Sequence, residues 1–465
     1  MKRMVLWLAA ALLVASFCVP AQTTTANPYR TERLSERVLL LREDSPMENL
    51  VVAIATRKGV VVVDSTGSPA TAAWFRAAVE REFKRSDFSH LILTHPHWDH
   101  AFGCQGFPGA SVVIHENGVQ ALAGSGTAAE GIAAGSRDRL AALRKELAAL
   151  KPDVKRKAEI GSDIAFRERI IQGLSAGFAP SPATLSFSDE MTLNMGDVSF
   201  HLVFFGRAHS GSDILIHIPE EKILITGDLF LDKGWLPLFA GMDVLDIPRW
   251  IDVLNKLFAD PAGFVTVIPG HRGTWRREKL AMWKEYIESL WAGVQAAKRE
   301  QLTFAEAAIR LPLAERYRYV TELGHTEEAL QRFHQRNVAA FWRQLLIPVV
   351  PMMDEILAKS GMQAAIDQCR TLRKTKPEQY NFGESGLNRY GYQLLGRGDK
   401  ASAVELFRFI AELYPDSANA YDSLGESYME SGDKERAIAN YEKSLQLDPE
   451  NDNAREMLKR LRRDK

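Results

Sequence analysis

Short β-branched apolar segments bounded by Gly, Ser or Pro recur through the first 270 residues of the chain. Segments of this kind are typical of strands. The predicted strands are residues 50–55, 60–64, 90–94, 111–114, 183–187, 191–194, 198–205, 214–218, 222–226 and 264–268. Residues 71–83 have helical spacing instead. The pattern therefore predicts an α/β domain in which helices alternate with strands.

Two further stretches have helical composition. Residues 136–171 are rich in Ala, Leu, Lys, Arg and Glu, which predicts a helical insertion over about 118–182. Beyond residue 279 the pattern predicts helices and no strands. We expect residues 301–346 to be a helical connector.

An internal repeat follows in residues 347–465. Large and small residues recur with a period of 34: Leu387, Tyr390, Gly391, Ala403, Phe407 and Pro415 correspond to Tyr421, Leu424, Gly425, Ala437, Tyr441 and Pro449. This period and its packing positions are those of tetratricopeptide repeats. A weaker copy places Cys369 in a slot for a large buried side chain, and residues 453–463 are predicted to cap the stack.

Composition is that of a soluble globular protein of several domains, with 46% hydrophobic and 25% charged residues. With a formal net charge of −1, the chain lacks the excess of positive charge that attracts the phosphates of nucleic acids, so we expect no nucleic-acid partner.

The N-terminus has the features of a signal peptide. Lys2 and Arg3 precede an apolar run over residues 4–19. Small residues follow this run, and they indicate a cleavage site near Ala21. We predict a signal peptide over 1–21, a periplasmic or secreted protein, and no membrane span after cleavage. An uncleaved anchor is the alternative, but the run is shorter than the roughly 20 residues that a span needs. Cleavage would leave two cysteines, too few for a disulfide framework.

The sequence THPHWDH follows the strand predicted at 90–94 and concentrates side chains that bind metals. A proline between the first two histidines favours extended backbone, in which His95 and His97 project to the same side. Asp99 and His100 come directly after and could serve a second ion. Imidazole and carboxylate without thiolate suit zinc, with iron or manganese as alternatives.

Three later residues occupy a similar place in the pattern. His209, Asp228 and His271 each follow an apolar strand and lie beside glycine. Each alone is more typical of a turn, but their common position after a strand favours a role in the same metal site.

With these residues the chain resembles the metallo-β-lactamase superfamily, whose HxHxDH motif is met by His95, His97, Asp99 and His100. The resemblance covers about residues 27–291 and implies an αββα sandwich, which we extend to a catalytic domain over 27–300. It also implies two metal ions. One would be held by His95, His97 and His209, the other by Asp99, His100 and His271, with Asp228 bridging them.

The chemistry implied is hydrolysis with two Zn²⁺ per chain. A hydroxide held by the metals would attack a substrate carbonyl in an amide, lactone, ester or thioester, and Asp99 would orient it and take its proton. A bridging aspartate at position 228 is more typical of glyoxalase II-like and lactonase members than of dedicated β-lactamases. No serine-hydrolase, P-loop or dinucleotide motif supports another enzyme class.

Two other functions stay open. One is an iron-dependent persulfide dioxygenase on the same fold, and the other is an interaction protein whose repeats bind a protein partner and whose metal domain is vestigial. Nearby residues are expected to have mainly structural roles: His90, His115, Cys104, Ser210 and Ser212.

Overall fold

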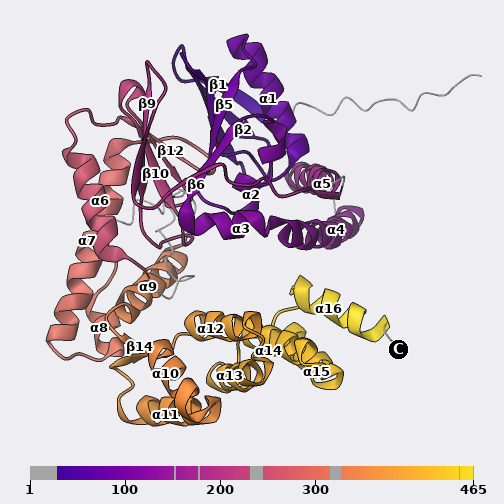
Figure 1. Cartoon of the computed structure of the whole chain (residues 1–465), viewed down its shortest axis with the longest axis vertical. Helices are drawn as coiled ribbons and strands as arrows, with labels where there is room; N and C mark the ends of the chain where they lie inside the picture. The colour runs from indigo at the N-terminus through magenta and orange to yellow at the C-terminus, as the bar shows by residue number, and fades with distance from the viewer. Residues whose placement is uncertain are drawn as a thin grey trace, which may run out of the picture.

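Two β-sheets lie face to face at the centre of the N-terminal domain in this computed structural model (Figure 1). The structure describes residues 29–150, 153–175, 178–230, 245–314, 326–449 and 451–463. The predicted signal peptide, 1–21, lies outside these residues. Among the described residues, no helix is long and apolar enough to cross a membrane.

The first sheet has seven strands in sequence order. They are β1 (Tyr29–Arg33), β2 (Val38–Glu43), β3 (Leu50–Thr56), β4 (Gly59–Val63), β5 (Phe88–Ile92), β6 (Ser111–His115) and β7 (Leu185–Phe187). The first four are antiparallel, and β4 to β7 are parallel. Parallel neighbours need crossover segments, and each of the three crossovers here contains helical residues. Strands β1 and β2 were not predicted from the sequence.

The second sheet has six strands in the order β13-β12-β11-β10-β9-β8. They are β8 (Glu190–Asn194), β9 (Ser199–Phe204), β10 (Ile214–Ile218), β11 (Ile223–Gly227), β12 (Thr266–Pro269) and β13 (Trp275–Arg276). Only β11 and β12 are parallel; the other pairs are antiparallel.

Alternation along the strands separates three apolar layers. Val52 and Ile54 of β3 face the second sheet, whereas Val51 and Ala53 face the helices on the outer side of the first sheet. Helix α1 (Pro69–Phe83) packs on that outer face and begins at Ser68, whose side chain accepts from Thr71 N. Helices α6 (Ile247–Ala259), α7 (Arg277–Arg299), α8 (Phe304–Arg310) and α9 (Glu327–Arg343) contribute to the layer outside the second sheet. The result is the αββα sandwich expected from the sequence.

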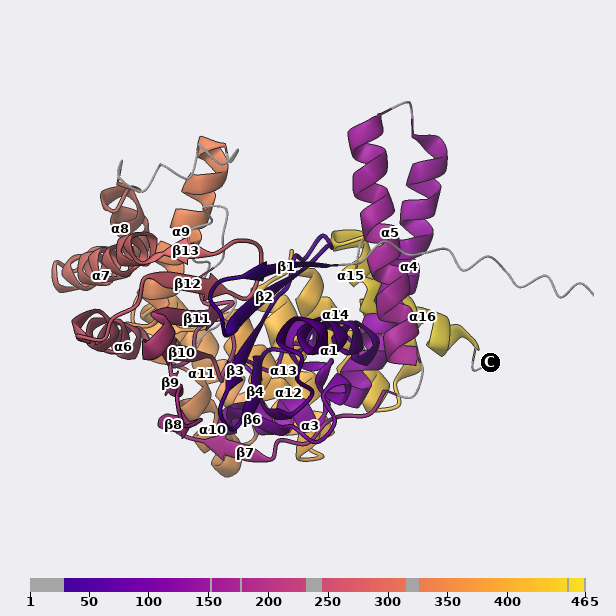
Figure 2. The same cartoon turned by 90° about the horizontal axis from the view of Figure 1, so that it is seen from above.

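The segment between β6 and β7 is helical, as its composition predicts. It contains α3 (Val119–Ala123), α4 (Ser125–Ala149) and α5 (Val154–Ser175), and the two long helices form a hairpin that projects from the sandwich (Figure 2). Phe166 and Ile170 of α5 join the apolar layer of the first sheet. The hairpin is therefore anchored at its base.

The C-terminal region is a stack of helix pairs with its own apolar core. The helices are α10 (Val350–Ser360), α11 (Met362–Thr375), α12 (Glu384–Gly396), α13 (Lys400–Leu413), α14 (Ala418–Glu430), α15 (Lys434–Leu447) and α16 (Asp452–Arg463). Cys369 is buried in this core, as predicted. The expectation of helices alone after residue 279 was wrong in one detail, because β14 (Ile347–Pro348) and β15 (Tyr380–Asn381) form a two-residue ladder. Helix α16 contacts α4 of the hairpin (Figure 1).

Candidate metal centre

The predicted site residues come from the ends of strands in both sheets. Residues 93–97 follow β5 and lead into the short helix α2 (Trp98–Ala101), which contains Asp99 and His100. Asp228 follows β11 directly, and His271 comes two residues after β12. His209 lies in the loop between β9 and β10. The sandwich therefore brings these segments together at one end, where open sheets commonly place their sites.

The first group of side chains consists of His95, His97 and His209. Nδ1 of His97 lies 3.0 Å from Nε2 of His95 and 2.9 Å from Nε2 of His209. The three ring nitrogens thus converge, and they are close enough together to hold one ion. A neutral imidazole ligand binds a metal through one such nitrogen lone pair.

The second group consists of Asp99, His100 and His271, with Asp228 beside it. Nε2 of His271 lies 3.2 Å from Oδ2 of Asp99 and 3.1 Å from Oδ2 of Asp228. Nε2 of His100 lies 3.3 Å from Oδ1 of Asp228. Asp228 also approaches the first group, because its Oδ2 is 3.6 Å from Nε2 of His209. It therefore lies between the groups, where a bridging ligand would be.

Hydrogen bonds on the outer side of the histidines fix which nitrogen faces the centre. Nδ1 of His271 donates to the Met47 carbonyl at 2.8 Å, and Nδ1 of His100 donates to Asp64 at 3.0 Å. Nδ1 of His95 lies 3.1 Å from the hydroxyl of Thr94, which itself donates to Asp64. Each contact leaves Nε2 with a lone pair pointing inward, the arrangement that supporting residues give to metal-binding histidines.

The charges are consistent with a cation between these groups. Burial, reinforced by the neighbouring His100, holds the pKa of His95 well below its usual range, so this ring is neutral and can act as a ligand. Burial opposes ionisation of Asp228, yet the neighbouring His100 and His271 hold its pKa well below the usual value. Carboxylates, with Asp228 foremost, raise the pKa of His271 to about 9 against the effect of burial, so they favour positive charge beside Nε2, and a cation there would supply that charge in place of a proton.

A buried carboxylate oxygen supports the fit of a metal. Oδ1 of Asp228 is buried and accepts no hydrogen bond among the described residues, although Nε2 of His100 lies 3.3 Å from it. A buried ionised oxygen that accepts no hydrogen bond is costly, and a cation would stabilise it. The donor set of five histidines and two aspartates suits zinc, iron or manganese, so the residues present fit the metal pair that the sequence implies.

Glycine permits the close approach of these segments. A Cβ atom on Gly270 would lie 2.1 Å from Oδ1 of Asp228 and 2.7 Å from Cε1 of His100. Any larger residue would have to displace the side chains of Asp228 and His100. The glycine that precedes His271 in the sequence is therefore required by packing at the centre.

The centre is open on one side. His95 and His100 are each 1% exposed, whereas His97 and His209 are exposed. A substrate or water reaching the centre would approach past these two rings. The arrangement can hold two cations beside an accessible surface, which suits activation of water and polarisation of a substrate oxygen.

The structure brings all seven predicted site residues together. It gives the neighbouring candidates structural contacts: Nε2 of His115 donates to the Ser188 carbonyl, and Ser210 donates to Asp213 within the loop of His209. His90 lies on β5, Ser212 N donates to Ser210 Oγ, and Cys104 is buried beside Ser65 in a 3-10 turn.

Sequence reasoning missed Asp64 and Asn49. Asp64 follows the apolar strand β4, the same pattern that singled out Asp228, so the signal was present. Asn49, whose side chain contacts Asp99, precedes its strand, and no pattern in the sequence marked it.

Family models match two parts of the chain. Residues 46–284, about half of the chain, match the metallo-beta-lactamase superfamily, and residues 418–451 match the tetratricopeptide repeat. The chain is 31% identical over 259 residues to the 2,4-dinitroanisole O-demethylase subunit alpha of Nocardioides sp. (strain JS1661), covering 54% of this chain and 60% of that one. It is 25% identical over 107 residues to the metallo-beta-lactamase type 2 of Bacteroides fragilis, covering 22% and 43%. Each match thus covers less than two thirds of the curated relative.

Two solved structures align with this chain at low sequence identity. The sec-alkylsulfatase Pisa1 from Pseudomonas sp. aligns at 15% identity and a TM-score of 0.44, over 90% of this chain and 65% of that one. A metallo-beta-lactamase from Pontibacter korlensis aligns at 15% identity and a TM-score of 0.39, over 56% and 99%. Together, the αββα sandwich, the converging side chains and the family match over residues 46–284 place this chain in the metallo-β-lactamase superfamily, with a tetratricopeptide repeat in its C-terminal tail.

Proposed function

We propose that this chain is an exported zinc-dependent hydrolase that cleaves a carbonyl substrate. The convergence of seven imidazole and carboxylate side chains in two adjoining groups carries this proposal. His95, His97 and His209 would hold one ion, and Asp99, His100 and His271 the other, with Asp228 shared. Export is inferred from the basic and apolar character of residues 1–21.

When bound, two zinc ions would lower the pKa of a water molecule and stabilise negative charge on the substrate oxygen. The chain's own residues would position the reacting groups. Oδ2 of Asp99 is engaged by Asn49 and His271, so Oδ1 is the atom proposed to accept the proton of the attacking water. Exposed His97 and His209 border the approach, and the buried rings of His95 and His100 exclude water from the inner side.

The proposed substrate is an amide, lactone, ester or thioester. A polyanionic phosphodiester is less favoured, because the net charge of −1 offers little attraction for one. The relative named as a 2,4-dinitroanisole O-demethylase subunit adds aryl methyl ethers to the compounds worth testing. Its match covers only part of that protein, so the ether is a test compound and not the expected substrate.

Elemental analysis with a substrate panel tests the proposal. Purified protein is loaded with zinc, its metals are counted, and lactam, lactone, thioester, phosphodiester and dinitroanisole substrates are assayed. We expect about two zinc ions per chain and turnover of a carbonyl compound. If the protein instead holds one iron ion tightly and consumes oxygen with a persulfide substrate, it is a dioxygenase and the hydrolase proposal is wrong. If the protein binds no metal and turns over no substrate, the alternative of an interaction protein with a vestigial metal domain is favoured.

The repeats are proposed to bind a protein partner. Their helices form a core separate from that of the sandwich, so they do not complete the metal centre. Stacked repeats present extended surfaces that commonly bind proteins. Capture on the immobilised 347–465 segment, compared with the full chain, tests this, and recovery of the same protein by both is the expected result.

A further inference from the structure

The loop of residues 44–49 between β2 and β3 lies against the segment that contains His271. Asn49 and His271 form an isolated antiparallel bridge. Leu50 N donates to the Gly270 carbonyl at 2.8 Å, and Arg272 N donates to the Glu48 carbonyl at 2.8 Å. The main chain on both sides of His271 is therefore hydrogen-bonded to this loop or to the strand that follows it.

The side chain of Asn49 links the same loop to Asp99. Its Nδ2 lies 2.7 Å from the Asp99 carbonyl oxygen and 3.3 Å from Oδ2 of the Asp99 carboxylate. Both partner atoms are acceptors when Asp99 is ionised, so the amide must turn its NH₂ group toward them. Asn49 is 2% exposed, and its Oδ1 is buried without a partner among the described residues. The fold thus tolerates an unsatisfied oxygen while both hydrogen bonds to Asp99 are made.

We propose that Asn49 is a positioning residue that holds the Asp99 carboxylate in place for the second metal ion. This inference rests on the proposed two-metal function. Oδ2 of Asp99, which accepts from Asn49, also lies 3.2 Å from Nε2 of His271. The terminal torsion of an aspartate is soft, with a broad distribution. Two hydrogen bonds from one amide, to the main chain and the side chain of Asp99, restrict that torsion.

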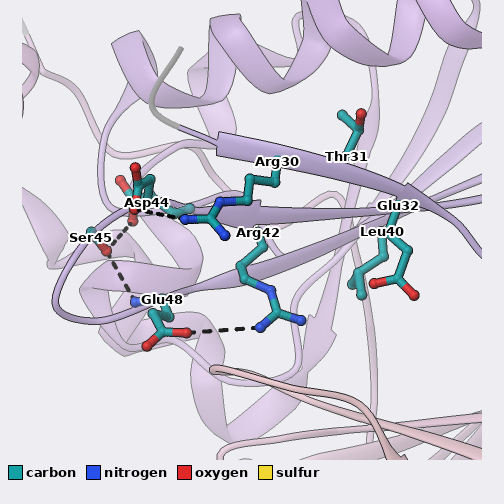
Figure 3. A pocket seen from close by; sticks show the side chains of 9 residues that line it. Arg30, Thr31, Glu32, Leu40, Arg42, Asp44, Ser45 and Glu48 are labelled. Atoms are coloured by element: carbon teal, nitrogen blue, oxygen red, sulfur yellow. Dashed lines mark hydrogen bonds and ion pairs between the residues drawn. The ribbon is translucent and has the colours of Figure 1, made fainter. Parts of the chain in front are cut away.

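The 44–49 loop is itself braced, which gives Asn49 a fixed base. Oγ of Ser45 accepts from Glu48 N at 3.1 Å and donates to the buried carboxylate of Glu43 at 3.2 Å. Figure 3 shows the loop from the side of β1 and β2, where Arg42 lies 3.9 Å from Glu48. The side chains drawn there line a pocket of about 450 Å³, and none of the seven site residues is among them.

The helical hairpin adds a further contact. Arg169 of α5 donates to the Asp44 carbonyl at 3.4 Å and lies 3.8 Å from Glu43. The loop that carries Asn49 is thus held by the first sheet, by the segment of His271 and by the insertion. A residue on so constrained a loop can orient a neighbour without moving itself.

Metal titration of full-length variants tests the proposal without relying on turnover. Asn49→Leu keeps a similar side-chain volume and removes the amide donor. Asn49→Ala removes the amide donor and most of the side-chain volume. Metal-free protein is titrated with Zn²⁺ against a competing chelator, and Co²⁺ spectra follow the two ions separately. We expect the first ion to bind as in the wild type and the second to bind about 10- to 100-fold more weakly in both variants.

The matched control is Asn194→Leu. Asn194 is exposed at the end of β8, and its side-chain oxygen accepts a hydrogen bond from Gly196 N within the same turn. We expect both ions to bind this variant with wild-type affinity. Thermal unfolding of all variants accompanies the titrations.

The outcomes separate this proposal from the function on which it rests. Unchanged binding of the second ion in Asn49→Leu overturns the positioning role, even if the wild type hydrolyses its substrate. Equal weakening of both ions, or a large loss of stability in both variants, assigns Asn49 a general structural role and also overturns it. If the wild type binds two ions and hydrolyses nothing in the panel, the hydrolase fails while selective loss of the second ion still supports Asn49. A wild type that binds one ion overturns both.

Discussion

Oδ2 of Asp64 lies 3.0 Å from Nδ1 of His100 and 2.9 Å from the hydroxyl of Thr94, which in turn contacts Nδ1 of His95. One buried carboxylate therefore supports a histidine in each of the two groups of the candidate metal centre. Asp64 itself has a φ of 61°, so its carboxylate is presented from left-handed backbone at the end of β4.

Asp64→Asn is expected to weaken both metal ions. Asparagine tolerates left-handed backbone, so the fold should persist while the charge that orients His100 is lost. We expect an affinity loss of about 10- to 100-fold, larger for the second ion, because His100 contacts Asp64 directly. Zinc titration against a chelator measures it. Asp87→Asn, at an exposed carboxylate paired with Arg85, is the control. Unaltered affinity in Asp64→Asn would show that its hydrogen bonds are dispensable.

Asp228→Asn is expected to weaken mainly the second ion. The substitution removes a negative charge between two cations, and the neutral amide is a poorer bridging ligand. Activity on the carbonyl substrate should fall by about 10-fold or more, and excess zinc should restore part of it. Metal content and rate are measured at several zinc concentrations. Full activity with two tightly held ions would falsify the bridging role.

A pair of glycines in α12 tests the packing of the repeats. A Cβ on Gly391 would lie 2.5 Å from Cζ of Phe407, whereas a Cβ on Gly396 would meet nothing within 4 Å. Gly391→Ala should destabilise the repeat region by about 1–3 kcal/mol through overpacking. Gly396→Ala should raise its stability by up to about 1 kcal/mol through helix propensity. Denaturant unfolding of the 347–465 segment measures both, and equal effects would contradict the packing argument.

A buried histidine should make stability depend on pH. Nε2 of His334 donates to the Leu311 carbonyl, and its Nδ1 accepts from the Tyr286 hydroxyl at 3.1 Å. Burial lowers the pKa of His334 below 6.5, and the Leu311 carbonyl only partly opposes this. The unfolded chain therefore binds the proton more readily. The neutral ring's contribution to the free energy of unfolding is therefore complete above about pH 6.5, and it declines as the pH falls toward the pKa of His334 in the folded state.

His334→Gln removes this titration. We expect the wild type to lose more unfolding free energy than the variant between about pH 8 and about pH 5.5. Urea unfolding at the two pH values measures the difference. Titrating groups of the metal centre are present in both proteins, so they cancel in the comparison. A pH dependence identical in wild type and variant would rule out the contribution of His334.

The sequence alone predicted most of the strands, the repeat tail and the seven candidate residues of the centre, whereas the αββα arrangement was implied by the resemblance to the metallo-β-lactamase superfamily. It could do so because each signal is local. Alternating or continuous apolar runs indicate strands, a period of 34 residues indicates helix pairs, and HxHxDH concentrates metal-binding side chains in one turn of chain. His209, Asp228 and His271 shared a position after a strand, so even these distant residues carried a local mark.

Only the tertiary structure decided which residues support them. Asn49 and Asp99 are 50 positions apart, and Arg169 reaches Glu43 from the hairpin. The periodicity of apolar residues cannot predict such contacts, because they depend on the register between β2 and β3 and on where the hairpin is anchored. Strand β1 escaped prediction for a related reason, whereas β2 begins with four buried apolar residues, a signal that was present in the sequence and was missed. Tyr29 is buried and the rest of β1 is exposed, so its pairing with β2 and not its own apolar pattern makes it a strand.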